Sequence, residues 1–251
     1  MSSLENPLEA YFRNNDDRLI HKWIHYFDIY HRHFERFRGK KPVVLEFGVS
    51  QGGSLQMWRD YFGRGAKIHG VDINPKCKEL EQRNTKIFIG DQEDREFLRS
   101  IVEEIGPVDV LIEDGGHLGP QQIATYEEIY PTMSEDGVFL IEDLHTSYWP
   151  KWGGGYRKPG TFMQYAKGLT DKLNAWHSKQ PRRLQVDDFT RTTKSMHFYD
   201  SIVVFERGSV VKPHAEKTGK ATVNDPQWKR PGRLAGLRGR LAGLRGRLSR
   251  G

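Results

Sequence analysis

Short apolar runs alternate with segments of helical periodicity along the middle of the chain. The apolar runs cover residues 42–47, 67–73, 86–89, 108–112 and 138–141, and the helical patterns cover 55–62, 95–105 and 121–130. Strands separated by helices form right-handed crossovers, which place the strands side by side in one sheet. The pattern therefore predicts an α/β domain with a doubly wound, mostly parallel sheet.

The segments on either side complete the predicted domain. Residues 18–38 place aromatic side chains at helical spacing, which predicts one or two helices that pack on the sheet and can roof an active site. The histidines of this segment are interpreted as packing or surface residues: His21, His25, His31 and His33. Residues 196–206 have no helical pattern at their centre and predict a C-terminal antiparallel hairpin.

The chain divides into four parts by composition. An N-terminal helical segment (1–40) precedes the main domain (41–207), which is followed by a polar linker with three prolines (208–232) and a basic tail (233–251). Of the 39 lysines and arginines eight lie between residues 229 and 250, where there is no acid, so 31 bases stand against 33 acids elsewhere. The domain is thus near neutral, which disfavours nucleic acid as its partner.

The N-terminal sequence and the cysteine content bear on localisation. The start Met1-Ser-Ser-Leu-Glu-Asn-Pro lacks the basic and apolar stretches of a signal peptide, and nowhere do about 18 apolar residues run together. Cys77 is the one cysteine, so no internal disulfide can form. We therefore expect a soluble, cytoplasmic protein.

A glycine-containing loop follows the first predicted strand. Gly48 and Gly52 let the backbone turn sharply and approach a ligand, and the next helix offers free amide hydrogens. Asp72 ends the second strand, 24 residues after Gly48, where an acid can accept hydrogen bonds from ribose hydroxyls. This predicts a nucleoside-containing cofactor, although a purely structural turn would look similar. The spacing G-x-x-x-G-G disfavours a nicotinamide dinucleotide.

Acidic and histidine residues follow the fourth and fifth predicted strands. Residues 112–117 read IEDGGH, and residues 141–145 read IEDLH. The carboxyl ends of neighbouring parallel strands meet in one crevice, so these side chains should converge. Carboxylates suit a hard divalent cation and histidine suits a general base, whereas acids that only cap helices are the structural alternative. His117 is favoured as the base because Gly115 and Gly116 free it to move, and His145 is its rival.

The segment 145–162 mixes aromatic residues with glycines and prolines. Aromatic faces stack on the C–H faces of sugars, and glycine hinges permit a lid to close. We therefore expect Tyr148 and Trp149 to contact a substrate. Core packing is one alternative, and a subunit contact in a homo-oligomer is the other.

Several of these motifs resemble those of class I S-adenosylmethionine-dependent methyltransferases. Within that class the chain is most similar to metal-dependent sugar O-methyltransferases, which act on deoxysugars of macrolide and tetracenomycin antibiotics and on mannoside polysaccharides. The resemblance covers residues 22–207. Its most specific pieces are GGSLQMWRDYFGRG (52–65), GDQ (90–92), DGGH (114–117) and IEDLHTSYWPKWGGG (141–155).

This resemblance implies a Rossmann-like enzyme that uses S-adenosylmethionine and Mg²⁺ to methylate a sugar hydroxyl of a glycoside, glycolipid or polysaccharide. It assigns the cofactor to Glu46, Gly48, Gly52, Asp72, Asp91 and Gln92, the metal to Asp114, Glu142 and Asp143, and the base to His117. The alternatives are a cephalosporin-hydroxylase-like relative with the same cofactor pocket but other chemistry, and a noncatalytic adaptor that works through its basic tail.

The tail 233–251 repeats leucine and arginine with a period of seven. A helix here would carry one leucine seam flanked by arginines, but four internal glycines each cost about 1 kcal/mol relative to alanine and disfavour that helix in water. Self-pairing would set arginine against arginine. An anionic membrane surface would bury the leucines and neutralise the arginines, so we expect peripheral membrane binding, with a functionless extension as the alternative.

Vesicle flotation checks the tail hypothesis. At moderate salt, the full chain should float with anionic liposomes and stay behind with neutral ones, because both the leucine and the arginine contacts are needed. A chain truncated after Pro231 should remain at the bottom in both cases. Equal flotation of the two chains would rule out the tail as the anchor.

Overall fold

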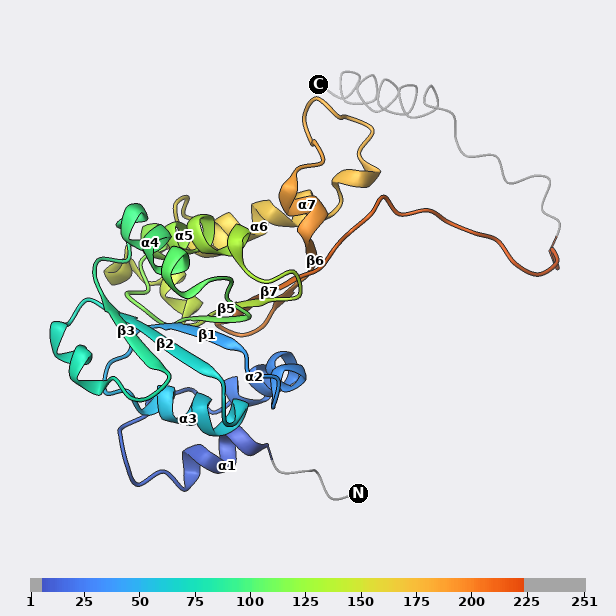
Figure 1. Cartoon of the computed structure of the whole chain (residues 1–251). Helices are drawn as coiled ribbons and strands as arrows, with labels where there is room; N and C mark the ends of the chain where they lie inside the picture. Colours follow the sequence, from blue (N-terminus) through green and yellow to red (C-terminus); the bar gives the residue numbers. More distant parts are fainter. Residues whose placement is uncertain (1–5, 224–251) are drawn as a thin grey trace, which may run out of the picture. The chain divides into compact units, whose positions relative to one another are not determined.

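The computed structural model describes residues 6–223 of the chain and contains one seven-stranded sheet (Figure 1). The strand order is β3-β2-β1-β4-β5-β7-β6, and all neighbours are parallel except at the β5–β7 and β7–β6 pairs. The strands are β1 (Val43–Phe47), β2 (Lys67–Asp72), β3 (Thr85–Ile89), β4 (Val110–Glu113), β5 (Val138–Ile141), β6 (Thr193–Phe198) and β7 (Val203–Arg207). The predicted doubly wound sheet and its antiparallel C-terminal hairpin are confirmed.

Helices cover both faces of the sheet (Figure 1). One face carries α1 (Pro7–Arg13), α2 (Tyr26–Phe34) and α3 (Gly53–Phe62); the other carries α4 (Arg95–Ile105), α5 (Gly119–Ile129) and α6 (Phe162–Leu173). A short helix, α7 (Asp188–Thr192), leads into β6. Short 3₁₀ helices are also present: Glu35–Phe37, Pro75–Leu80, Tyr130–Thr132, Leu144–Tyr148, Pro150–Trp152 and Ala175–His177.

The core is split by the sheet into two apolar layers. Successive strand residues point to opposite faces, so Val44 packs with α1 to α3 while Leu45 packs with α4 to α6. Trp58 of α3 and Tyr30 of α2 are fully buried in the first layer and meet edge to face, with ring centroids 5.2 Å apart. This packing fixes α2 over the same edge of the sheet at which β1 and β4 end.

The N-terminal segment differs from its prediction. Helical spacing continues from residue 18, yet the helix begins only at Tyr26, and the residues between α1 and α2 form a loop. This loop lies against the start of α3 so closely that a side chain on Gly53 would come within 2.4 Å of the Arg18 carbonyl oxygen. The loop carries Lys22 into a group of carboxylates, and pairing of that buried charge explains why helical propensity does not prevail here. Helix α1 lies within the predicted helical segment 1–40 but was not placed individually, and helices α6 and α7 were not predicted.

The chain divides into two units after Lys212. Residues 213–223, the described part of the second unit, contain no helix or strand. The remaining linker residues and the basic tail lie outside the described residues. Among residues 6–223, every helix is too short or too polar to cross a bilayer.

Candidate active site

The site lies where the strand order reverses, at the carboxyl ends of β1 and β4. Ligands of open α/β sheets bind at this position because the loops that leave the two strands diverge there. Two cavities, of about 170 and 330 Å³, occupy this edge and share Gly48, Asp72 and Gly115 in their walls. The smaller reaches Asp91 and Gln92, and the larger reaches Asp114, His117 and Asp143.

The glycine loop after β1 makes the close approach that its sequence predicts. Gly48 has a φ of +87°, and a Cβ atom there would stand 2.0 Å from the carbonyl oxygen of Asp114. The loop after β1 therefore touches the loop after β4, and a larger residue would push them apart. Gly52, with a φ of +74°, precedes the first turn of α3.

Asp72 fastens the end of β2 to the glycine loop. Its carboxylate accepts hydrogen bonds from the backbone amides of Ser50 at 2.9 Å and Asn74 at 2.8 Å. Since Asp72 lines both cavities, it lies where a ribose hydrogen-bond acceptor was expected. Of the residues predicted to hold the cofactor, Gly48, Asp72, Asp91 and Gln92 line a cavity; Gly52 and Glu46 are not among the lining residues.

Gln92 orders the loop after β4. Its buried amide donates to Glu113 at 2.6 Å and to Thr125 at 2.9 Å, and its oxygen accepts from the Gly116 amide at 3.1 Å. Burial raises the pKa of Glu113 to about 7. A Cβ on Gly115 would lie 2.3 Å from the Gln92 oxygen, so glycine is required for this packing.

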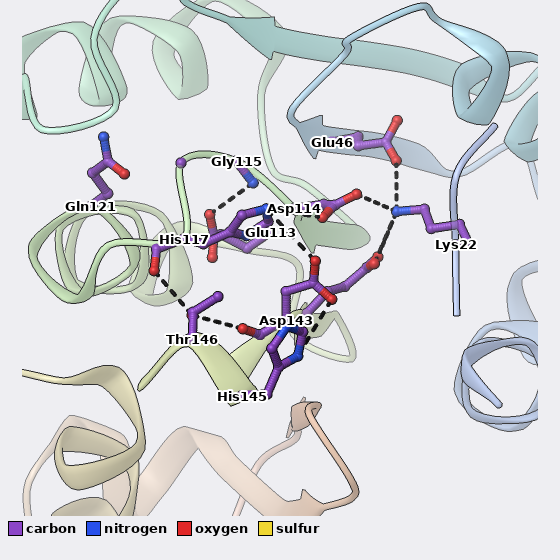
Figure 2. Close-up of polar contacts among 12 residues, drawn as sticks. Lys22, Glu46, Glu113, Asp114, Gly115, His117, Gln121, Asp143, His145 and Thr146 are labelled. Carbon is purple, nitrogen blue, oxygen red and sulfur yellow. Dashed lines mark hydrogen bonds and ion pairs between the residues drawn. The ribbon is translucent and has the colours of Figure 1, made fainter. Parts of the chain in front are cut away.

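A buried lysine forms ion pairs with three of the acids at this edge. The Lys22 ammonium lies 2.5 Å from Asp114 Oδ2, 2.9 and 3.0 Å from the two Glu142 oxygens, and 3.9 Å from Glu46 Oε1 (Figure 2). Only 3% of its side chain is exposed. Burial alone would lower the pKa of Lys22, but the charges of Asp114, Glu142 and Glu46 raise it well above its ordinary value, so the ammonium stays charged.

Glu46 is fully buried beneath this lysine. Its carboxylate accepts hydrogen bonds from the Ser54 hydroxyl at 2.6 Å and the Trp58 indole at 3.0 Å. Burial is the main reason that the pKa of Glu46 rises to about 7, and Lys22 opposes that rise. Glu46 thus links β1 to α3 from below the cavities.

Asp114, His117 and Asp143 come together beside Lys22. Each offers one ligand atom, and these atoms lie within 4.8 Å of one another. His117 Nε2 is 3.9 Å from Asp114 Oδ1 and 3.7 Å from Asp143 Oδ2 (Figure 2). The two carboxylates fit a hard divalent cation, and the imidazole lies beside them, where it can act as a base. The third predicted ligand, Glu142, has both oxygens on Lys22.

Two residues of this group hold a left-handed backbone. His117 has a φ of +57° and Asp143 a φ of +53°, which is uncommon outside glycine and is typical of functional sites. The Thr146 hydroxyl lies 2.7 Å from the Asp143 carbonyl and 3.2 Å from the His117 carbonyl, so it braces both loops. The Tyr26 hydroxyl donates to Asp143 Oδ1 at 2.7 Å and fixes that carboxylate.

The two candidate bases have different surroundings. His117 Nδ1 is buried and has no hydrogen-bond partner among residues 6–223. His145 Nδ1 lies 3.2 Å from the Ser201 hydroxyl and 4.0 Å from Asp143 Oδ1. The His145 ring lies between Trp23, which it meets edge to face at a centroid distance of 5.8 Å, and Trp149, to which it is tilted at 4.5 Å. His117 therefore lies inside the group of carboxylates, and His145 lies at its aromatic rim.

Sequence reasoning missed Lys22, Tyr26 and Trp23. All three belong to the aromatic segment that was expected to roof the site, but no spacing rule relates them to acids about a hundred residues away. One signal could have pointed to Lys22. It is a lysine in a segment rich in aromatic residues, and the chain places acids at the ends of its predicted strands.

Comparisons with known proteins show which proteins the chain resembles. Residues 45–144 match a family described as a methyltransferase domain. The 8-demethyl-8-alpha-L-rhamnosyl tetracenomycin-C 2'-O-methyltransferase of Streptomyces olivaceus is 35% identical over 198 residues, which is 74% of this chain and 51% of that protein. Demethylmacrocin O-methyltransferase of Streptomyces fradiae is 33% identical over 204 residues, which is 76% of this chain and 51% of that protein.

A solved structure is similar as well. The MycE methyltransferase from the mycinamycin biosynthetic pathway, in complex with Mg and SAH, superposes with a TM-score of 0.71 at 29% identity. The match covers 81% of this chain and 54% of that one. The chain thus spans about half the length of the curated relatives that it matches.

Replacing Lys22 tests its structural role. Lys22→Met should lower the free energy of unfolding by about 3 to 5 kcal/mol, because it leaves buried carboxylates without their counter-charge. Urea denaturation measures this change. The double variant Lys22→Met/Glu142→Gln should regain part of the loss, since it also removes one uncompensated charge.

Lys167→Met, at an exposed position of α6, is the matched control and should change stability little. If Lys22→Met lowered the free energy of unfolding no more than Lys167→Met does, the proposed structural role of Lys22 would be contradicted.

Proposed function

We propose that the chain methylates a sugar hydroxyl, because residues 45–144 match a methyltransferase domain and the curated relatives to which the chain is similar are O-methyltransferases of glycosylated compounds. S-adenosylmethionine is the proposed methyl donor, Mg²⁺ the proposed metal, and the acceptor a glycoside, glycolipid or polysaccharide. The observation that carries this proposal is the convergence of Asp114, His117 and Asp143 on a cavity that continues into the glycine loop of β1.

The cofactor is proposed to span the two cavities. Asp91 and Gln92 lie at the end that suits adenine, Asp72 lies between the cavities where the ribose would sit, and Gly48 leaves room for the methionine part. Gly52 would present the first amides of α3. Glu46 is proposed to act indirectly, because it holds Ser54 and faces Lys22, and both of those residues line the larger cavity.

Asp114 is suited to serve two cations at once. Its Oδ2 is bound to Lys22, whereas its Oδ1 faces His117 and Asp143. We propose that Asp114 and Asp143 hold Mg²⁺ through the oxygens that face this side. Glu142 would be the third ligand. Both of its oxygens now contact Lys22, and one of them would bind the metal as well.

The chemistry requires deprotonation of a weakly acidic alcohol. A bound divalent cation orients neighbouring sugar hydroxyls and lowers the pKa of the attacking one. We propose that His117 Nε2 accepts the hydroxyl proton, while the sugar oxygen forms its bond to the methyl carbon and the S–CH₃ bond breaks. The products are the methyl ether, S-adenosylhomocysteine and a protonated imidazole, which later releases its proton to solvent.

A row of aromatic side chains lies at the rim of the site. Trp149 and Tyr148 are 48% and 41% exposed, and Trp23 is 52% exposed on the other side of His145. Large exposed apolar side chains grouped beside a polar cavity favour contact with a ligand. We propose that Tyr148 and Trp149 stack on the acceptor sugar or on its apolar aglycone.

Peripheral membrane binding by residues 233–251 stays part of the proposal. These residues lie outside the described part of the chain, and their composition is its support. The flotation experiment given above tests it separately from catalysis.

The methyl-transfer proposal is tested with labelled S-adenosylmethionine and a panel of glycosides, with Mg²⁺ or with EDTA. Label should pass to a glycoside only with Mg²⁺. Asp143→Asn should abolish transfer but leave calorimetric binding of S-adenosylmethionine nearly unchanged, because Asp143 acts on the acceptor side.

Trp149→Ala in the same assay should raise KM for the glycoside and leave KM for the donor unchanged.

Asp171→Asn, an exposed change of the same type on α6, is the control and should retain wild-type turnover. Full activity in EDTA would contradict the role of the metal. Absence of transfer to every glycoside, with the donor bound, would contradict the proposed acceptor.

The base is tested by two histidine variants. His117→Ala should lower turnover by about 10² to 10⁴, the usual range for a lost general base. His145→Ala should have a smaller effect, expressed mainly in KM, because that ring packs against Trp149 at the rim. The reverse order of the two effects would exchange the assigned roles.

A further inference from the structure

We propose that His33, His197 and Glu206 form a second metal site, suited to Zn²⁺ or a similar transition-metal ion, that fastens α2 to the antiparallel strands β6 and β7. Each of the three residues offers a ligand atom, and these atoms lie within 4.8 Å of one another. They come from three different elements and are separate from the residues of the candidate active site. The proposal does not depend on the methyltransferase activity.

The Glu206 carboxylate lies between the two imidazoles. His33 Nδ1 is 2.7 Å from Glu206 Oε1, and His197 Nε2 is 3.9 Å from Glu206 Oε2. The two rings are tilted, with centroids 4.7 Å apart. Zinc binds nitrogen and oxygen at about 2.0 to 2.2 Å, so tetrahedral ligand atoms stand about 3.3 Å apart. The observed separations bracket that value, and small rotations of His197 and Glu206 would reach it.

Neighbouring hydroxyls complete the arrangement around these ligands. The second nitrogen of His33, Nε2, lies 2.9 Å from the Tyr199 hydroxyl. A metal on Nδ1 would place the ring proton on Nε2, where the Tyr199 oxygen can accept it, as is usual for metal-bound histidine. The Ser195 hydroxyl lies 3.3 Å from Glu206 Oε2 and 3.0 Å from His197 Nε2, the atoms that would bind the ion, so metal binding would displace this hydroxyl.

The nature of the ligands distinguishes this site from the acidic one. Two imidazoles with one carboxylate suit zinc and its neighbours, whereas Mg²⁺ prefers oxygen ligands alone. His33 is buried, but His197 and Glu206 are partly exposed, so an ion can enter from solvent and keep a water in its fourth position.

Helix α2 connects the proposed ion site to the candidate active site. His33 lies at the C-terminal end of α2, and Tyr26, at its N-terminal end, donates a hydrogen bond to Asp143. An ion that ties the far end of α2 to the sheet would hold Tyr26, and the preceding loop with Lys22, in place. We therefore assign the site a positioning role.

Zinc binding to the full chain without a purification tag tests this proposal. Calorimetric titration with Zn²⁺ in excess Mg²⁺ should reveal a site whose affinity falls about 100-fold or more in His197→Gln. Co²⁺ should give a visible absorption spectrum of a low-coordinate histidine site in the wild type and not in this variant. Zn²⁺ should also raise the melting temperature of the wild type more than that of the variant.

His197 is partly exposed, so its replacement should leave the fold intact, and His33→Gln provides a second, buried ligand variant. His177→Gln, at an exposed histidine outside the cluster, should bind Zn²⁺ like the wild type. Asp114→Asn should also keep this binding, which separates it from the acidic group. Equal Zn²⁺ affinity and Co²⁺ spectra in the wild type and His197→Gln would overturn the proposal, as would absence of Zn²⁺ binding to the wild type.

Discussion

The ion pairing of Lys22 is the interaction on which the active-site edge depends. The ends of β1, β4 and β5 bring Glu46, Asp114 and Glu142 together at low exposure, and three carboxylates so close would repel one another. One ammonium, contributed from a distant loop, meets all three. Removing one partner from such a group costs far more than the net stabilisation it provides, because the remaining charges stay buried.

This pairing also explains the shape of the N-terminal segment. The loop before α2 must bring Lys22 over the sheet, and α2 then packs Tyr30 on Trp58 in the apolar layer below. Tyr26 reaches Asp143 from the first turn of the same helix. The segment that closes the site is thus held by a buried charge, a hydroxyl and an aromatic core, which together orient the carboxylates before any ligand binds.

The elements that follow from local pattern were predictable. Parallel strands appear as short apolar runs, and the rule that their carboxyl ends converge brought Asp114, His117 and Asp143 into one hypothesis that the geometry supports. Lys22 and Tyr26 escaped prediction because their partners are 92 to 120 residues away in the chain. The helical spacing of residues 18–25 was misleading for the same reason, since a long-range ion pair decides the backbone there.

Asp114 contacts both the glycine loop that lines the two cavities and the group of acidic residues. Its carbonyl oxygen touches the position that a side chain on Gly48 would fill, one carboxylate oxygen binds Lys22, and the other faces His117. A shift of the β1 loop would therefore displace Asp114, and a shift of Asp114 would disturb both the lysine pairing and the group that we propose holds the metal. The proposed cofactor site at Gly48 and the proposed cation site at Asp114 therefore both border the same stretch of backbone, residues 113–117. Gln92 holds residues 113–117 in this position by its hydrogen bonds to Glu113 and Gly116.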